Sequence, residues 1–141
     1  MCIRDRSSVI DEYSDAPFFS LKDKCCKGKV VHVYDGDTVH VIMETFGSVF
    51  KWRCRIAHID CPELRTRNIE EKTQGYIARD IVKDLLLNKT VELKCLDFDK
   101  YGRLLVEITV CIDEKDVLLH EWLISNNYAQ PYEGKTKLGW K

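Results

Sequence analysis

The sequence contains no long apolar run. No segment of its 141 residues approaches the roughly 18 consecutive apolar residues that a membrane-spanning helix needs. The charged start, Met1 to Arg6, is not followed by the apolar core of a secretory signal. We therefore expect no membrane partner and no secretory signal.

The cysteine spacings of a zinc site are also missing, although the chain has seven cysteines. There is no Cys-x-x-Cys pair, and the adjacent Cys25 and Cys26 would chelate a metal poorly on their own. We interpret most of these cysteines as small buried apolar side chains in a reducing compartment, which favours a cytoplasmic or intracellular location. Secretion stays open if the N-terminus is truncated. A metal- or redox-responsive interaction domain stays as an alternative, which stoichiometric zinc in the purified protein would support.

The sequence also lacks an excess of positive charge. The chain has 22 Lys and Arg against 23 Asp and Glu, for a net charge of −1, whereas nucleic-acid-binding domains are usually basic. Two local basic clusters exist: Lys22, Lys24, Lys27 and Lys29, then Arg53, Arg55, Arg65 and Arg67. Composition by itself therefore does not indicate a nuclease.

The length and the 45% apolar content fit one soluble globular domain. Residues 1–24 show no clear periodicity, and their start, which is unlike the rest, is left out of the fold prediction. We expect a loosely ordered leader over 1–24, with Phe18, Phe19 and Leu21 docking on the domain. The nuclease-like domain described below is expected over 25–141.

From Gly28 onward the pattern has period two, which predicts strands. The expected strands are Lys29 to Tyr34, Thr38 to Glu44 and Val49 to Ile59, joined by turns at Asp35-Gly36 and Phe46-Gly47. In the second strand, Val39, Val41 and Met43 fall on one face. The first half of the chain is therefore predicted to be a three-stranded antiparallel meander.

The second half begins with a helical pattern over Glu70 to Leu87. Its apolar positions at helical spacing are Ile77, Ile81, Val82, Leu85 and Leu86, and Asn88 is the expected stop. Strands are predicted over Thr90 to Leu96 and Arg103 to Cys111, and a short helix over Val117 to Ser125 with Asp116 as its N-cap. The tail from Asn126 is expected to be mostly loop.

This order of elements predicts an α+β, mainly β fold. We expect a five-stranded OB-fold barrel with one long helix between strands 3 and 4 and a short helix after strand 5. Such barrels often bind oligonucleotides, but fold alone does not give function. The functional prediction therefore depends on particular residues.

Three short segments carry groups suited to phosphoryl-transfer chemistry. Asp37 and Asp60 lie near the ends of different strands, and two carboxylates brought together repel unless a cation lies between them. Oxygen ligands suit Ca²⁺ or Mg²⁺. Pro62 stiffens the stretch between Asp60 and Glu63, so one acid could bind metal while the other deprotonates water. Taken alone, Asp35-Gly36-Asp37-Thr38 is better explained as a hairpin turn with a capping aspartate. The stretch from Asp60 to Glu63 could be an acidic loop at the start of a helix.

Two arginines complete the set. Arg55 precedes the Asp60 segment, and Arg103 follows the turn glycine Gly102. Planar guanidinium groups match the charge that develops on phosphate oxygens. Each arginine alone could equally be a solvated surface charge.

The three segments together, in this order, resemble the staphylococcal nuclease (thermonuclease) family. They read Asp-Gly-Asp-Thr, then Arg-x-x-x-x-Asp-x-Pro-Glu, then Asp-Lys-Tyr-Gly-Arg. The resemblance covers roughly Lys27 to Tyr132, and the order of strands and helix between the motifs agrees with it. The chain departs from the family in its low pI of about 6.4 and in having only residues 133–141 where a further helix is usual.

The resemblance implies a role for each matching residue. Asp37, Asp60 and the backbone carbonyl of Cys61 would bind Ca²⁺, where many relatives have threonine in place of Cys61. Glu63 would be the general base that activates water. Arg55 and Arg103 would hold the phosphate, and Lys100, Tyr101 and Tyr132 would contact the nucleotide.

The function that the resemblance implies is a calcium-dependent nuclease that hydrolyses phosphodiester bonds. DNA and RNA would be its partners, with single-stranded or frayed substrates preferred and 3′-phosphate products, and we expect a monomer. The alternative is a non-catalytic OB-fold module that binds nucleic acid. Degenerate modules of that kind lose catalytic acids or arginines, which this sequence keeps.

Overall fold

A computed structural model describes residues 15–62, 64 and 66–132 of the chain. The strands are β1 (Cys25–Asp35), β2 (Thr38–Thr45), β3 (Ser48–Ile56), β4 (Ile59–Asp60), β5 (Thr90–Phe98), β6 (Leu104–Ile112), β7 (Lys115–Leu118) and β8 (Gln130–Pro131). Two helices are described, α2 (Ile69–Leu86) and α3 (Leu119–Ser125). Six of the strands form one sheet in the order β3-β2-β1-β5-β6-β7.

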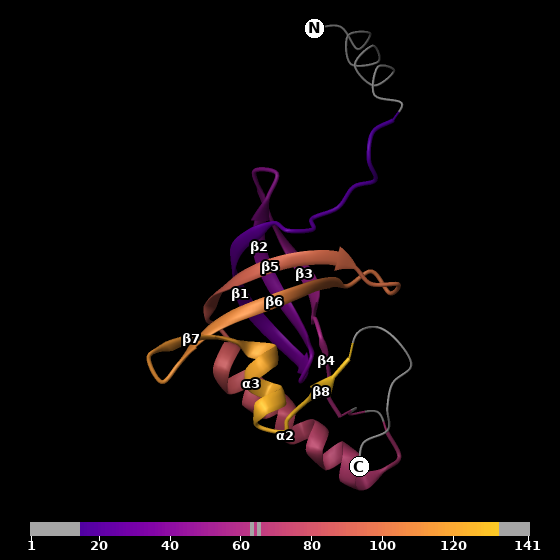
Figure 1. Ribbon diagram of the computed structural model, residues 1–141, viewed down its shortest axis with the longest axis vertical. Coiled ribbons are helices and arrows are strands. Elements are labelled where there is room, and N and C mark those ends of the chain that lie inside the picture. Colours follow the sequence, from indigo (N-terminus) through magenta and orange to yellow (C-terminus); the bar gives the residue numbers. More distant parts are fainter. Residues whose placement is uncertain (1–14, 63, 65, 133–141) are drawn as a thin grey trace, which may run out of the picture.

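The sheet closes into a barrel because β3 also pairs with β6 (Figure 1). This pairing is parallel, whereas all the other pairings in the sheet are antiparallel. The barrel strands are β1, β2, β3, β5 and β6, with α2 between the third and fourth of them and α3 after the fifth. The predicted fold class is therefore confirmed.

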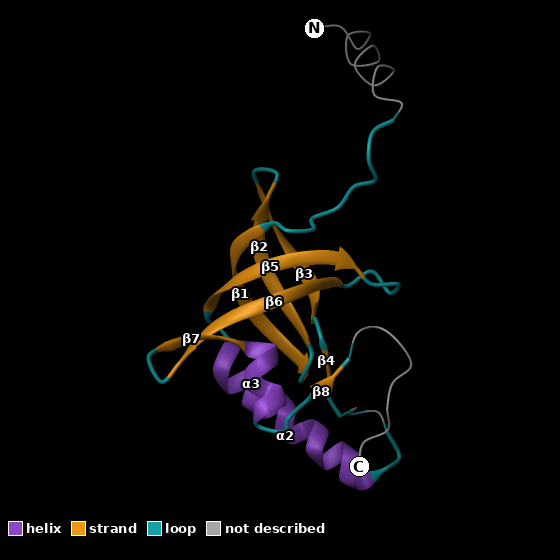
Figure 2. Cartoon of the chain, in the orientation of Figure 1, coloured by secondary structure: helices purple, strands orange, loops and turns teal. Residues whose placement is uncertain are grey.

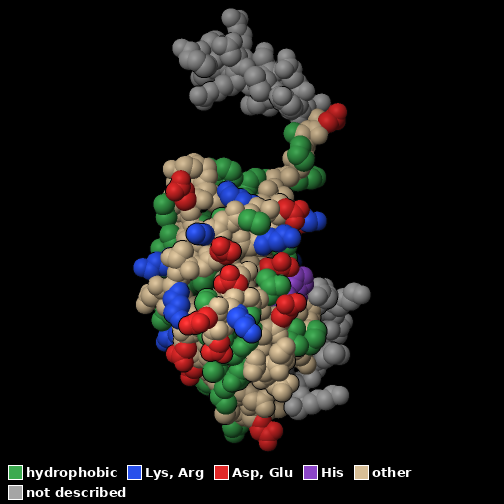
Figure 3. Space-filling model, turned by 60° about the vertical axis from the view of Figure 1, so that its left-hand side comes forward, with side chains coloured by type: hydrophobic (Ala, Val, Ile, Leu, Met, Phe, Trp, Pro, Cys, Tyr) green, Lys and Arg blue, Asp and Glu red, His purple; other side chains and the backbone are tan. Residues whose placement is uncertain are grey.

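Both helices lie at one end of the barrel, together with the small sheet formed by β4 and β8 (Figure 2). The hairpin between β2 and β3 lies at the opposite end, and its turn has positive φ at Phe46 and Gly47, as the predicted tight turn requires. On the face shown in Figure 3, Lys and Arg are interspersed with Asp and Glu. That mixture agrees with a net charge close to zero.

The core fills the barrel from alternate positions of its strands. Val39, Val41 and Met43 are buried, as the period-two pattern predicts. On α2 the buried residues are Gly75, Ala78, Val82 and Leu86. Ile77, one of the apolar positions whose spacing predicted the helix, is 48% exposed.

The short C-terminal helix begins later than predicted. Asp116 is not its N-cap, because Lys115–Leu118 form β7 and Asp116 pairs with Cys111 of β6. The helix begins at Leu119 with Leu118 as its N-cap, and no side chain caps it. Pairing with a neighbouring strand therefore overrides the local capping signal.

Two further boundaries differ from the predictions. β3 ends at Ile56 instead of continuing to Ile59, because His58 has a positive φ of 72° and turns the chain. The segment after Asn126, predicted to be mostly loop, also contains the two-residue strand β8, in which Gln130 pairs with Asp60. This pairing brings the end of the described chain back to the barrel.

Part of the predicted leader packs on the domain. Leu21 is buried in the core, and the backbone N–H of Asp23 donates to the carbonyl of Cys95 at 2.8 Å. Phe19 lies against Phe46 with ring centroids 5.8 Å apart, whereas Phe18 is fully exposed. Residues 1–14 lie outside the described part, so the predicted domain boundary stays a prediction.

Six of the seven cysteines fall within the described residues, and all six are free thiols. Cys54, Cys61 and Cys95 are buried, Cys26 is half-buried, and Cys25 and Cys111 are exposed. The two helices described are both too short or too polar to cross a membrane.

Candidate active site

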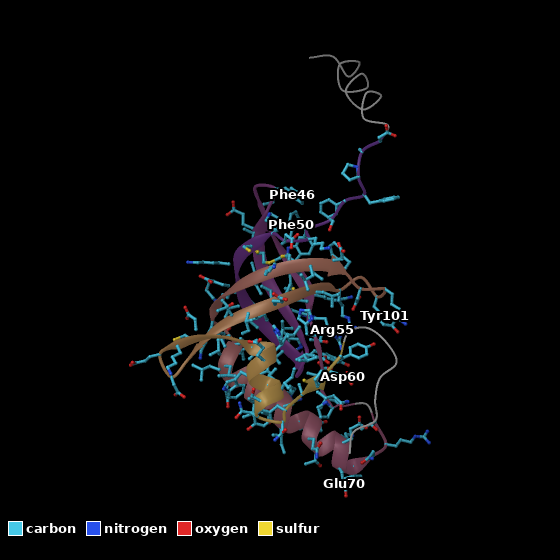
Figure 4. All side chains as sticks on the ribbon, in the orientation of Figure 1. Phe46, Phe50, Arg55, Asp60, Glu70 and Tyr101 are labelled. Atoms are coloured by element: carbon cyan, nitrogen blue, oxygen red, sulfur yellow. The ribbon has the colours of Figure 1, made fainter. Side chains whose placement is uncertain are left out.

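The three motif segments meet at one rim of the barrel. Thr38, at the start of β2, pairs with Arg55 near the end of β3. Arg103, at the end of the β5–β6 turn, donates from Nη1 to the Thr38 hydroxyl at 3.2 Å. Figure 4 shows Arg55, Asp60 and Tyr101 on the same side of the barrel, far from Phe46 and Phe50 on the β2–β3 hairpin. Barrel closure thus gathers residues that lie far apart in sequence.

The turn between β1 and β2 packs so closely that only glycine fits at its centre. A Cβ atom on Gly36 would lie 2.7 Å from Sγ of Cys61 and 3.1 Å from Cβ of Ala78. Both neighbours are themselves buried. Next to it, the backbone N–H of Asp37 donates to Oδ1 of Asp35 at 3.1 Å, which fixes the turn. Gly36 therefore lets the turn that carries Asp37 reach the segment that carries Asp60.

Asp37 links all of these segments. Its Oδ1 accepts a hydrogen bond from the Thr38 hydroxyl at 3.2 Å. Its Oδ2 accepts from the backbone N–H of Cys61 at 3.2 Å and from Nη2 of Arg55 at 3.4 Å. The residue is only 6% exposed, so these contacts are largely shielded from water.

Arg55 lies between the two predicted metal-binding carboxylates. Its Nη2 is 3.4 Å from Oδ2 of Asp37 and 3.7 Å from Oδ1 of Asp60. The Tyr132 ring covers the guanidinium, with 5.2 Å from Cζ of Arg55 to the ring centroid. Arg55 and Asp60 are 7% and 4% exposed, and charges buried to this extent are costly unless they are paired.

Arg103 is held by the turn that precedes it. Its Nε donates to Oδ2 of Asp99 at 2.8 Å, and its backbone N–H donates to Oδ1 of Asp99 at 2.9 Å. The Tyr101 ring lies 5.5 Å from Cζ of Arg103 and 5.1 Å from Nζ of Lys100, and Tyr101 is 71% exposed. This turn therefore presents two cations and an aromatic ring at the edge of the site.

Negative charge exceeds positive charge in the buried part of the rim. Burial, and next the negative charge of Asp37, raise the pKa of Asp35 from 3.8 to about 7. Burial, followed by the charges of Asp37, Asp35 and Asp60, raises the pKa of the Cys61 thiol well above its ordinary value. Cys61 is therefore a protonated, buried thiol beside three carboxyl groups.

The predicted site residues that the structure describes are brought together. Arg55 contacts Asp37, Asp60 and Tyr132, Asp37 accepts a hydrogen bond from Cys61, and Arg103 joins them through Thr38. Lys100 and Tyr101 lie beside Arg103. Glu63, the predicted general base, lies outside the described residues.

The sequence prediction overlooked two positioning residues, Thr38 and Asp99. Thr38 bridges Asp37 and Arg103 through its hydroxyl, and Asp99 orients Arg103. Both stand inside the motifs already quoted, so their place in those motifs was the available signal. In the described ranges, no group of three or more His, Cys, Asp or Glu side chains is arranged to hold a metal ion by itself.

Comparison with known proteins agrees with this site. The family described as staphylococcal nuclease homologue matches residues 53–138. An uncharacterized protein of Methanocaldococcus jannaschii is 34% identical over 125 residues, which cover 74% of this chain and 58% of the relative. Uncharacterized endonucleases of Escherichia coli and of its strain O157:H7 are 36% identical over 81 residues, which cover 57% of this chain and 46% of each relative.

The chain thus spans about half the length of the curated relatives that it matches. The family match covers more than half of the chain and includes Arg55, Asp60 and Arg103. It agrees with the barrel and with the motifs that meet at its rim. The chain therefore belongs to the staphylococcal nuclease homologue family.

Proposed function

We propose that this domain hydrolyses phosphodiester bonds in DNA and RNA in a calcium-dependent reaction. The observation that carries the proposal is the convergence of two arginines and two buried carboxylates, Arg55, Arg103, Asp37 and Asp60, on one rim. The family supports nucleic acid as the substrate class, since relatives in it are named endonucleases.

The two arginines would bind the scissile phosphate. Charge-assisted hydrogen bonds are typically about 2.7–2.9 Å long, whereas Arg55 lies 3.4 and 3.7 Å from its carboxylate partners. Both separations exceed that range, so N–H groups of Arg55 could form shorter hydrogen bonds to phosphate oxygens. Asp99 orients Arg103 through Nε, which leaves the outer part of that guanidinium to donate to the same phosphate. Together they would stabilise the charge that builds up in the transition state.

A calcium ion fits the chemistry of the carboxylates. Asp37 and Asp60 would bind it with the backbone carbonyl of Cys61, and water and substrate would supply further oxygens, since no complete protein cage occurs in the described residues. Burial, and next the negative charge of Asp37, raises the pKa of Asp35 to about 7, and a divalent cation bound at Asp37 would offset the second of these effects. When bound, the ion would neutralise a non-bridging phosphate oxygen.

Glu63 is proposed as the general base. It follows Asp60 by three residues, directly after Pro62, as in the motif of the family. It would take a proton from a water in line with the phosphorus, and the 5′ P–O bond would break to leave 3′-phosphate ends. Single-stranded or frayed nucleic acid would enter such a rim more easily than a stiff duplex.

The test is a cleavage assay on single-stranded DNA and RNA with Ca²⁺, with Mg²⁺ and with a chelator. We expect cleavage with Ca²⁺ and none with the chelator. Glu63→Gln should lower turnover by about 10²–10⁴, the usual contribution of a general base. Glu70→Gln is the matched control, because Glu70 is exposed at the start of α2, away from Arg55 and Asp60 (Figure 4).

The outcomes separate catalysis from binding alone. Undiminished cleavage by a folded Glu63→Gln variant would remove Glu63 from its role. Tight binding of oligonucleotides by the wild-type protein with no cleavage under any metal condition would instead identify a non-catalytic OB-fold module.

A further inference from the structure

The outer face of the β1–β2–β3 meander carries positive charge in two cross-strand rows. In one row His32 pairs with His40, which pairs with Arg53. Directly opposite residues in a sheet point to the same side, so these three side chains lie together. They point outward, because Val39 and Val41, on either side of His40, point into the core.

The second row lies two residues further along the strands. Here Lys29 pairs with Ile42, which pairs with Lys51. Lys29, Lys51 and Arg53 are exposed, and none of them forms an ion pair with another described residue. No acidic side chain stands in either row, and Glu44 borders the face beyond the second one.

Electrostatics at His40 reflects this clustering. Partial burial lowers the pKa of His40, and the positive charges of His32, Arg53 and Lys51 lower it further. The rings of His32 and His40 are 5.0 Å apart. The side chains of both rows are thus close enough to act on one another as a single cationic surface.

This surface continues into the candidate active site. The next row in the other direction consists of Asp35, Thr38 and Arg55, which lie on the same face of the sheet at the strand ends. Here Thr38 and Arg55 are buried, and the Tyr132 ring lies over Arg55. Strands rise about 3.4 Å per residue, so the Arg53 row lies about 7 Å, and the Lys51 row about 14 Å, from the row of Arg55. A strand bound at Arg55 would therefore meet both rows.

We infer that this outer face binds the phosphates of single-stranded nucleic acid next to the scissile phosphate. The inference deepens the proposed nuclease function and rests on it for the position of the scissile phosphate. Flexible single strands suit a cationic path along a barrel, where backbone phosphates provide most of the affinity. It also accounts for nucleic-acid binding by a chain whose net charge is −1, since affinity would depend on this local surface.

The test uses the double variant Lys51→Thr/Arg53→Thr in the full chain. Threonine suits an outward position on a strand, so the barrel should fold, and its thermal unfolding is compared with that of the wild type. The matched control is Lys83→Gln/Lys115→Thr, which removes the same charge from exposed positions on α2 and β7.

Binding is measured by fluorescence anisotropy with a labelled 20-nucleotide oligothymidylate in the presence of a chelator, at several salt concentrations. The double variant should bind about 10-fold more weakly near physiological salt, and the control less than about 2-fold. Loss of two phosphate contacts should reduce the slope of log K against log salt by about 1.4.

Cleavage adds a second readout. The ratio of kcat/KM for the 20-nucleotide substrate to kcat/KM for a dinucleotide should fall about 10-fold in the double variant, because a dinucleotide is too short to reach the Lys51 row.

Equal binding and equal ratios for the double variant and the wild type would overturn the inference while leaving the nuclease intact. Equal losses in the control variant would also overturn it. If the wild type cleaved no substrate, the proposed function would be wrong. The anisotropy measurement would still test whether the outer face binds nucleic acid.

Discussion

At the level of single residues, the site depends on how closely its turn approaches the Asp60 segment. Gly36 is buried between Cys61 and Ala78, neither of which is a flexible side chain that could move aside. Gly47, in contrast, has a φ of +75° and open space around its α-carbon. The two glycines are therefore required for different reasons, one by packing and the other by backbone conformation.

Gly36→Ala should destabilise the protein by about 1–3 kcal/mol, the usual cost of overpacking. It should also lower any cleavage activity, because Asp37 would move away from the N–H of Cys61. Gly47→Ala should cost about 1–2 kcal/mol through its left-handed backbone and leave activity unchanged. Urea unfolding and the cleavage assay measure both effects. Combining Gly36→Ala with Cys61→Ala should restore part of the stability, and no restoration would show that the thiol is not the obstacle.

His40 reports on the cationic surface without any ligand. Arg53→Thr removes one of the positive charges that lower the pKa of His40, so this pKa should rise toward its ordinary value of 6.5. NMR titration of the histidine ring measures it, with Lys83→Gln as a variant that should leave it unchanged. A lowered folded-state pKa means that protonation of His40 opposes folding. The free energy of unfolding should therefore decrease slightly as the pH falls below about 6.5. An unchanged His40 pKa in Arg53→Thr would show that the charge of Arg53 does not act on His40.

At the level of elements, local pattern predicted the five barrel strands and the long helix, but it missed β7 and β8. The alternation of Val39, Val41 and Met43 reflects one buried face, which is a property of the strand itself. Lys115–Leu118, by comparison, is strand only because β6 lies beside it, and no local signal in those residues reports a neighbour. The same holds for Gln130–Pro131, which is too short to show a period.

The face of α2 was also predicted only in part. Large apolar residues indicated the helix, but two of its four buried residues are small, Gly75 and Ala78. Ala78 packs closely against Gly36 of the β1–β2 turn. Ile77 is displaced to the surface as a result. Periodicity identifies a helix, but the distance to the neighbouring element decides which side chains fit beneath it.

This packing gives opposite predictions for two adjacent positions. Ala78→Leu should destabilise the domain by about 1–3 kcal/mol, since a larger side chain would press on Gly36. Ile77→Thr should change stability by no more than about 0.5 kcal/mol apart from helix propensity, because Ile77 is half exposed. Chemical denaturation of both variants measures the difference. A larger loss in Ile77→Thr than in Ala78→Leu would mean that α2 packs through its other face.

At the level of the whole molecule, the sequence motifs identified most of the candidate site but not its assembly. Asp37, Asp60 and Arg103 could be selected from short patterns, whereas their contacts depend on closure of the barrel by β3 and β6. The position of Tyr132 over Arg55 depends in addition on the pairing of β4 with β8. Long-range pairings of this kind leave little trace in local sequence.

Closure of the barrel also places three carboxyl groups, Asp35, Asp37 and Asp60, near a single buried arginine. A calcium ion that binds only the folded protein should therefore raise its unfolding temperature. At a concentration 100 times the Kd the stabilisation is about 2.7 kcal/mol. For a domain of this size, each kcal/mol corresponds to roughly 3–4 °C, so a rise of about 10 °C is expected.

Asp60→Asn should abolish this calcium-dependent rise, because it removes one of the two carboxylates that we propose as calcium ligands. Asp84→Asn, an exposed change on α2, should retain it. Thermal unfolding with added CaCl₂ and with a chelator measures the shift in each protein. If Asp60→Asn showed the same rise as the wild type, calcium would bind elsewhere. The metal assignment of Asp37 and Asp60 would then have to be withdrawn.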